Sequence, residues 1–243
     1  MTAYAWESPV NAVAYDAFDQ RYPTYRISSS RLADEAALAP GERVVDLACG
    51  TGATTRQILT RVGPAGTITG VDASPAMLDV AGRNIRAPNV RWVTGQAERL
   101  DSVIDTPVDA VVCNMAFWQL TPAPTLSAIA RVLRPGGRLA FTISHRLLPP
   151  GHPMARDRDG IAPMLQDDEA TWVSRLEAHG FTRIRTLALA FEEPPEWLAA
   201  WLEVPALGRP VLSDRPGLPA HIRAAGLPTL QRTTYYVAMK PGP

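Results

Sequence analysis

Two acids and two glycines stand at a spacing that suits the binding of a nucleoside. Asp46 closes a short apolar run, Gly50 and Gly52 follow within a turn, and Asp72 ends a second run 22 residues beyond Gly50. Glycine permits a tight turn and lets a ligand approach the main chain. A carboxylate at the place of Asp72 can accept hydrogen bonds from both hydroxyls of a ribose. The pattern predicts a site for an adenosine-containing cofactor.

Local elements must position these four residues. The stretch 43–72 predicts a strand, a glycine turn, a helix over 54–62 and a second strand ending on Asp72. This is a βαβ unit with its site at the carboxyl edge of the sheet. A dinucleotide fingerprint would place a third glycine three residues after Gly52, so that the helix meets a pyrophosphate. Thr55 stands there instead, which weakens the alternative of a nicotinamide oxidoreductase.

The whole string Asp46-Leu47-Ala48-Cys49-Gly50-Thr51-Gly52 resembles the first motif of the class I S-adenosylmethionine-dependent methyltransferases. The stretches 72–78 and 131–139 are similar to further motifs of this family, and the resemblance covers roughly residues 40–144. It implies S-adenosylmethionine as the cofactor. It also implies a Rossmann-like, doubly wound α/β sheet, mostly parallel, with an antiparallel last strand.

The resemblance further implies which residues hold the cofactor. In the family, the residue after the second acid and a methionine enclose the adenine ring, which gives this role to Ala73 and Met77. Gln96 stands where family members carry an aspartate, and its carbonyl keeps an acceptor for the adenine amino group. The backbone N–H of Ala97 then meets a ring nitrogen. The implied cofactor-binding set is Asp46, Cys49, Gly50, Gly52, Asp72, Ala73, Met77, Gln96, Ala97, Asn114 and Tyr22.

The last two members of that set come from outside the motifs above. Asn114 ends a fourth predicted strand, and the carboxyl edge of an open α/β sheet faces the ligand, so we expect it near the methionine part of the cofactor. Residues 1–39 correspond to a helical lid in the family, and its tyrosines often touch the ligand. Tyr22 is the best candidate, although the rings of this region alternatively only pack the lid onto the domain. Plain core packing is the alternative for Met77.

The chain as a whole fits one α/β domain of 243 residues. We expect a lid over 1–39, in which serines 28–30 cap a helix over 31–38, and a cofactor-binding core over 40–144, whose fifth strand spans 138–144. Thirteen of the 23 prolines lie from Pro149 onward. There we expect a helix over 169–179 and strands over 181–189 and 233–239. Segments 145–166 and 191–228 have no place in the minimal fold, so we expect them to build substrate-cap insertions over the carboxyl edge.

Aromatic residues and one histidine are the candidates for the acceptor side. Trp118 follows a strand end, and Trp197 and Trp201 lie four apart on a predicted helix that begins after Pro194-Pro195. They predict an apolar pocket for a small, fairly hydrophobic acceptor. Packing is the alternative for each ring. His145 follows the fifth strand and is the best-placed base, although it equally suits a loop hydrogen bond.

Composition excludes several other functions. The net charge is zero, with 24 basic and 24 acidic residues and no block of like charge, so nucleic acid or an anionic membrane is not an expected partner. The first residues lack the pattern of a signal peptide, and no apolar run approaches the ~20 residues of a membrane helix. Two cysteines indicate a reduced, cytoplasmic protein. The histidines and cysteines show no metal-ligand spacing. Oligomeric state does not follow from the sequence.

These observations predict an enzyme that transfers a methyl group from S-adenosylmethionine to a small-molecule acceptor. Methyl transfer from a sulfonium is an in-line displacement, in which positioning and exclusion of water supply the catalysis and a general base is optional. The main alternative is an S-adenosylmethionine-binding protein that catalyses a cyclisation or isomerisation, because cofactor motifs report binding and not turnover. A nicotinamide oxidoreductase and a purely structural binding module are weaker alternatives.

Overall fold

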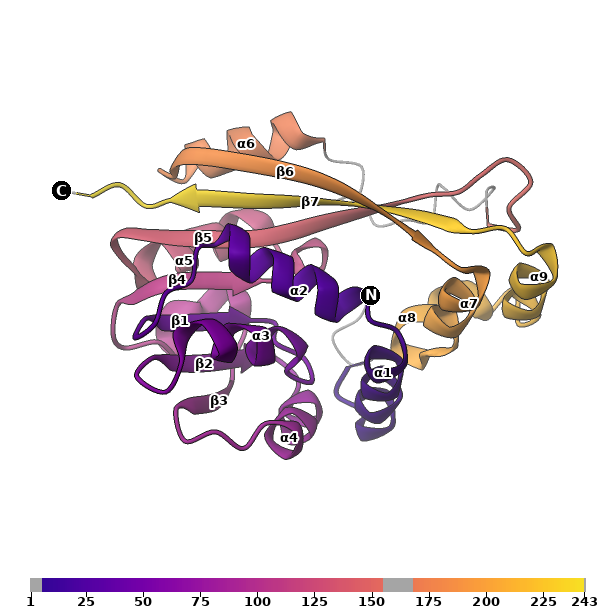
Figure 1. The fold of residues 1–243 in the computed structure, drawn as a ribbon, viewed down its shortest axis with the longest axis horizontal. Helices are drawn as coiled ribbons and strands as arrows, with labels where there is room; N and C mark the ends of the chain where they lie inside the picture. Colours follow the sequence, from indigo (N-terminus) through magenta and orange to yellow (C-terminus); the bar gives the residue numbers. More distant parts are fainter. Residues whose placement is uncertain (1–5, 155–167, 243) are drawn as a thin grey trace.

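The computed structural model describes residues 6–154 and 168–242. Within them, the strands form one seven-stranded sheet in the order β3-β2-β1-β4-β5-β7-β6 (Figure 1). Neighbours from β3 to β5 are parallel, and β7 runs antiparallel to both β5 and β6. This confirms the predicted doubly wound sheet with an antiparallel last strand. The strands are β1 (Arg43–Leu47), β2 (Thr67–Asp72), β3 (Val90–Thr94), β4 (Val108–Cys113), β5 (Leu133–Leu147), β6 (Thr182–Glu193) and β7 (Thr229–Met239).

Helices connect these strands and cover both faces of the sheet. Pro75, Pro122 and Pro195 each occupy a first turn, where a missing N–H costs nothing. The helices are α1 (Pro9–Arg21), α2 (Thr24–Glu35), α3 (Ala53–Val62), α4 (Pro75–Asn84), η2 (Ala97–Ser102), η3 (Phe117–Gln119), α5 (Pro122–Val132), α6 (Glu169–Ala178), α7 (Pro195–Glu203), α8 (Pro205–Leu212) and α9 (Leu218–Ala225).

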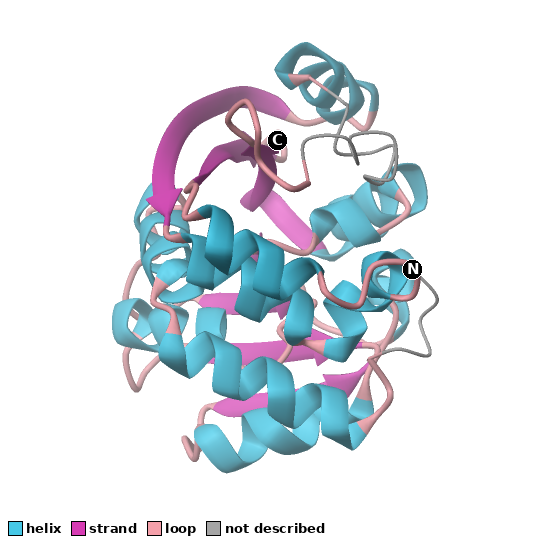
Figure 2. Cartoon of the chain, turned by 90° about the vertical axis from the view of Figure 1, so that its right-hand side faces the viewer, coloured by secondary structure: helices cyan, strands magenta, loops and turns pink. Residues whose placement is uncertain are grey.

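Side chains of the central strands point alternately to the two faces of the sheet and pack in two hydrophobic cores. Phe141 and Ile143 of β5 join the core under α5 and α6, where Trp172 is fully buried. Ala140 of β5 joins the other core, which lies under α2 and α3. Figure 2 shows helices standing in front of the strands on the viewer's side. Successive residues of a strand point to opposite faces of the sheet. Whether a residue of β5 is odd- or even-numbered therefore decides which of the two cores it faces.

The N-terminal region is helical as expected, but its helix boundaries differ. Instead of a helix over 31–38 capped by serines, α2 already begins at Thr24, and Ser28 and Ser29 lie buried inside it. Their hydroxyls bond to other elements: Ser28 Oγ donates to Asn114 Oδ1, and Ser29 Oγ pairs with Thr54 Oγ1. A serine hydroxyl serves a cap or a tertiary contact equally well, so a local pattern does not distinguish the two.

Strand β5 is longer than the predicted 138–144. It runs from Leu133 to Leu147 and pairs with β7 from Arg138 to Leu147 without a register shift. Since β7 supplies partners over this whole length, the strand continues far past the ends of β1 and β4. Its far end lies toward α7 and α9 (Figure 1). The proposed cap over 191–228 contains α7, α8 and α9, whereas most of the proposed insertion 145–166 lies outside the described residues.

Candidate functional site

The glycine turn after β1 has the backbone geometry that the sequence predicts. Gly50 and Gly52 have φ of 53° and 93°, in the left-handed region that favours glycine. A Cβ on Gly52 would lie only 2.9 Å from Cδ1 of Ile85, so a larger residue would also collide. Ala48 shares the left-handed conformation with φ of 54°. A non-glycine residue there is uncommon and typical of functional turns.

Asp72 ties the end of β2 to this turn. Its Oδ2 accepts from the Gly50 N–H at 2.8 Å, and its Oδ1 accepts from the Ser74 N–H at 2.9 Å. Burial raises the pKa of Asp72, and the backbone N–H groups of Ser74, Gly50 and Ala73 partly offset that effect. Each carboxylate oxygen has about two acceptor sites, so each keeps one for a ligand hydroxyl. The carboxylate therefore suits the predicted role of ribose acceptor.

Asp46 lies beneath the turn, where only one oxygen has a partner. Thr55 Oγ1 donates to Asp46 Oδ2 at 2.5 Å, whereas Asp46 Oδ1 is buried without a hydrogen bond. Burial raises the pKa of Asp46 to about 7, and the negative charge of Asp72 adds to the effect. At the position where a dinucleotide fingerprint carries glycine, Thr55 thus supplies the hydroxyl that bonds to Asp46. Cys49 is buried beside both acids, and its burial raises the pKa of the thiol, as expected for a packing residue.

The predicted adenine-side residues line the next two connections of the sheet. Ala73 is exposed directly after Asp72, whereas Met77 is buried in a small core with residues of α1 and α4. Gln96 is exposed before η2, and Ala97 is buried in that helix. The exposed positions are accessible to a ring, and the burial of Met77 favours its alternative role in packing. Contact of these residues with the cofactor stays a prediction.

The lid tyrosine that lies beside the glycine turn is Tyr15, not the predicted Tyr22. A Cβ built on Gly50 would lie 3.8 Å from Cε1 of Tyr15, so that ring covers the turn. Tyr22 lies elsewhere, because its hydroxyl donates to the Glu196 carbonyl at 3.4 Å. The ring of Tyr15 also contacts the ring of Tyr25, with centroids 5.6 Å apart. The position of Tyr15, one turn before Phe18 on α1, carries no sequence signal that distinguishes it.

Asn114 stands at the predicted strand end, and its side chain makes three hydrogen bonds to other side chains. Its Oδ1 accepts from Ser28 Oγ at 2.8 Å and from Thr142 Oγ1 at 3.0 Å, while its Nδ2 donates to Ser29 Oγ at 3.0 Å. The amide therefore joins α2 to β4 and β5. This arrangement supports a role in holding the lid over the site. A direct contact of Asn114 with the cofactor stays a prediction.

The residues after Asn114 form a strained connection. Met115 has φ of 55°, and its N–H donates to Thr142 Oγ1 at 2.7 Å. Trp118 Nε1 donates to the Met115 carbonyl at 2.9 Å, which fixes the indole ring beside the strand end. Strain that neighbouring contacts maintain is common at ligand sites. The role of Trp118 as a wall of the acceptor pocket stays a prediction.

His145 and Arg146 lie on opposite faces of the long strand β5. Thr142 and Ser144 bond to residues beside α2, and by alternation Arg146 shares their face. His145 shares the face of Ile143, which packs in the core under α5 and α6. The register therefore does not support His145 as a base toward the lid side of the sheet. Sequence reasoning missed Arg146, which carries no motif.

Trp197 and Trp201 both lie on the helix α7, as their spacing predicts, within the proposed cap. They are buried in a cluster with Phe18 and residues of α8 and α9. Trp201 Nε1 donates to Tyr25 Oη at 3.3 Å, which joins the cap to the lid. The Arg146 guanidinium lies over the Trp201 ring, with Cζ 3.8 Å from the centroid. The pair therefore borders the face of β5 that looks toward the lid.

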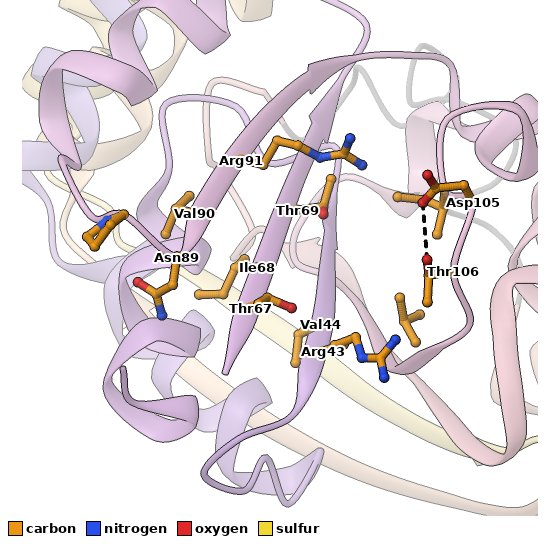
Figure 3. A pocket seen from close by; sticks show the side chains of 13 residues that line it. Arg43, Val44, Thr67, Ile68, Thr69, Asn89, Val90, Arg91, Asp105 and Thr106 are labelled. Carbon is orange, nitrogen blue, oxygen red and sulfur yellow. Dashed lines mark hydrogen bonds between the residues drawn. The ribbon is translucent and has the colours of Figure 1, made fainter. Parts of the chain in front are cut away.

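A surface hollow lies at the opposite edge of the sheet (Figure 3). It is bordered by the first residues of β1, β2 and β3, such as Arg43, Thr67 and Val90, and by Asp105 and Thr106 before β4. Ligands of open α/β sheets bind at the carboxyl ends of the strands. The hollow is at the amino ends and contains none of the residues of the glycine turn. We therefore assign the site to the edge marked by Asp72.

Among the described residues, no group of three or more His, Cys, Asp or Glu side chains is arranged to hold a metal ion. No helix in the described part of the chain is long and apolar enough to cross a membrane.

Comparisons with known proteins agree with this geometry. A family model described as "Methyltransferase domain" matches residues 44–137. An uncharacterized methyltransferase of Synechocystis sp. is 33% identical over 162 residues, which span 63% of this chain and 72% of that protein. Trans-aconitate 2-methyltransferase of Methylobacterium nodulans is 34% identical over 164 residues, or 67% of this chain. The match spans only 58% of that relative's length.

The fold is also found in solved structures. A phosphoethanolamine N-methyltransferase of Haemonchus contortus, in complex with S-adenosyl-L-methionine, aligns with a TM-score of 0.57 at 17% identity. The alignment covers 93% of this chain and 59% of that one. At this identity the likeness concerns the fold alone. Together with the motif geometry and the sequence relatives, it places the chain in the class I S-adenosylmethionine-dependent methyltransferase family.

Proposed function

We propose that this chain transfers a methyl group from S-adenosylmethionine to a small, fairly hydrophobic acceptor. The observation that carries the proposal is the arrangement of Asp72 against the Gly50 turn, with an acceptor site left on each carboxylate oxygen. That carboxylate would hold the ribose, and the turn would let the methionine part lie against the main chain. The family to which the chain belongs uses this cofactor.

The reaction would need little chemistry from side chains. The acceptor's lone pair attacks the methyl carbon as the S–CH₃ bond breaks, and S-adenosylhomocysteine leaves. Well-oriented reactions of this kind gain an effective molarity of ~10⁵–10⁸ M from positioning alone. The lid of α1 and α2, held by Asn114 and Ser28, would exclude water from the site. We assign no base, because His145 shares the face of Ile143 in the other core.

The acceptor side would be bordered by Trp118 and by the cap residues Trp197 and Trp201. These rings favour an acceptor with apolar parts. The similar proteins named above act on dissimilar molecules, trans-aconitate in one case and phosphoethanolamine in another. Their substrates therefore do not identify the acceptor of this chain.

Calorimetry and a turnover screen test the proposal. S-adenosylmethionine and S-adenosylhomocysteine should give saturable heats, and NAD should give none. A metabolite extract incubated with the protein and methyl-labelled cofactor should yield a labelled small molecule. NAD binding without binding of S-adenosylmethionine would refute the proposal. Cofactor binding followed by an unlabelled, rearranged product would favour the cyclisation or isomerisation alternative.

A further inference from the structure

Arg146 lies near the end of β5, in the part of the strand that extends beyond the residues of the predicted cofactor site. Asp46 of β1 is level with Val112 of β4, which is level with Ala140 of β5. Arg146 lies six residues farther along the same strand, or about 20 Å at the usual rise of a strand. It thus stands past the strand ends that carry the glycine turn, on the face of β5 that meets the lid and the cap. This is the side from which an acceptor would reach the methyl group.

The guanidinium lies among aromatic rings. Its Cζ is 3.8 Å from the centroid of Trp201 and 5.5 Å from that of Trp197. Among the described residues, Tyr25 is the titratable group that interacts electrostatically with Arg146. The Tyr25 hydroxyl accepts a hydrogen bond from the indole N–H of Trp201. Arg146 is partly buried, and stacking on indole rings is favourable for its cation but supplies no acceptor for its N–H groups.

Two hydrogen-bond donors of this cluster have no partner. Arg146 Nε and Trp197 Nε1 are both inaccessible to solvent and make no hydrogen bond within the described residues. The carboxylates of the cap are engaged elsewhere, because Glu196 and Glu203 both pair with Arg223 of α9. Glu193 accepts from Thr24 Oγ1 at 2.6 Å. The described part of the chain therefore offers Arg146 no counter-ion.

An unpaired cation in such surroundings is costly for the fold. Burial lowers the pKa of Arg146 to about 10, yet the side chain stays charged at neutral pH. A methionine of similar length would fill the same space without that cost, since burial of an unpaired charge is unfavourable. A planar guanidinium presents parallel N–H groups that match the two oxygens of a carboxylate. An anionic ligand would restore the missing hydrogen bonds and neutralise the charge.

We propose that Arg146 and the indole N–H of Trp197 bind a carboxylate group of the methyl acceptor. The inference rests on the proposed function and narrows its substrate class to small molecules that combine a carboxylate with an apolar part. The rings of Trp197 and Trp201 contact the apolar part, and the guanidinium fixes the orientation of the acceptor.

Binding measurements with matched probes test this site. Protein saturated with S-adenosylhomocysteine is titrated with acetate, phenylacetate, phenylacetamide and phenyl phosphate, and tryptophan fluorescence reports binding. Phenylacetate should bind at least tenfold more tightly than its neutral amide and more tightly than phenyl phosphate. Acetate should compete with it weakly. Equal affinity for the acid and the amide would overturn the proposal, and a preference for phenyl phosphate would overturn the carboxylate assignment.

Variants connect the selectivity to the residue. Arg146→Met should lose at least tenfold in phenylacetate affinity, with cofactor affinity changed less than twofold. Arg146→Lys should recover part of the affinity. Arg175→Met is the matched control, because Arg175 also stacks on an indole ring, that of Trp172 on the other face of the sheet. It should leave phenylacetate affinity unchanged.

The outcomes separate this inference from the proposed function. If Arg146→Met weakened S-adenosylhomocysteine as much as phenylacetate, the residue would hold the cofactor's own carboxylate and the inference would be wrong. If S-adenosylhomocysteine failed to bind the wild-type protein, the proposed function would fail first. Circular dichroism and the melting temperature show that each variant is folded, and loss of a partly buried, unpaired charge is expected to maintain or raise stability.

Discussion

Asn114 at the end of β4 and Ser28 inside α2, 86 positions apart in the chain, are joined by a hydrogen bond of 2.8 Å. The same amide also bonds to Ser29 and to Thr142. One side chain thus holds the lid helix against two strands of the sheet. Asn114→Ala should destabilise the protein by about 2–3 kcal/mol, because the buried hydroxyls of Ser28 and Thr142 lose the acceptor for their protons.

Urea denaturation measures this loss, and amide hydrogen exchange should show faster opening of α2 than of α5. Gln20→Ala is the control, since the Gln20 amide donates to Asp16 on an exposed surface. Its effect should stay within about 0.5 kcal/mol. Equal stabilities of the two variants would show that Asn114 does not hold the lid.

Asp72→Ala should weaken binding of S-adenosylhomocysteine at least tenfold. The change removes the proposed acceptor for two ribose hydroxyls and leaves the N–H groups of Gly50 and Ser74 without their present partner. Calorimetry measures the affinity. Asp79→Ala, an exposed acid on α4, is the control and should bind as the wild type does. Unchanged affinity in folded Asp72→Ala would place the ribose elsewhere.

Substitutions of Tyr15 and Tyr22 show which of the two lid tyrosines contacts the cofactor. Tyr15 covers the Gly50 turn, whereas the Tyr22 hydroxyl bonds to the start of α7. Tyr15→Ala should therefore raise the dissociation constant of S-adenosylhomocysteine roughly tenfold, since an aromatic contact of this kind contributes about 1 kcal/mol or more. Tyr22→Ala should change it less than twofold. The reverse order would restore Tyr22 as the cofactor contact.

Asp46 should make stability depend on pH. Its pKa of about 7 lies above the value of 3.8 for an unperturbed carboxyl, so the folded state binds the proton more tightly than the unfolded state. The contribution is fully present below pH 3.8 and is lost as pH rises through 7. Relative to Asp46→Asn, the wild-type free energy of unfolding should fall between pH 4 and 8, by at most about 4 kcal/mol. Denaturation at several pH values measures it, and parallel curves would contradict the assignment.

Substitutions of Trp201 distinguish a cap that covers the acceptor pocket from a Trp201 side chain that only packs the cap onto the domain. The side chain is 8% exposed, so Trp201→Ala should cost about 3–5 kcal/mol whatever its role. Trp201→Phe keeps a ring but removes the N–H that bonds to Tyr25. If the cap is the roof, this variant should raise the acceptor's KM while cofactor affinity stays constant. Unaltered acceptor kinetics with a lowered melting temperature would make Trp201 an anchor.

What the sequence alone determined is the part of the molecule built from near neighbours. The left-handed glycines, the strand on either side of α3 and the acid at the end of β2 are set by short-range rules. The bond from Gly50 to Asp72 closes within a single βαβ unit. Hydrophobic patterning likewise predicted the strands and helices of the cofactor-binding core, because each element must bury one face.

What only the tertiary structure decided depends on contacts between distant segments. The role of Ser28 inside a helix follows from the position of Asn114, and the face on which Arg146 lies follows from the uninterrupted register between β5 and β7. The position of Tyr15 beside Gly50, and of the Tyr22 hydroxyl at the Glu196 carbonyl, follows from how α1 packs against the rest of the fold. In each case the local sequence permits several arrangements of nearly equal energy, and the packing of remote elements selects one.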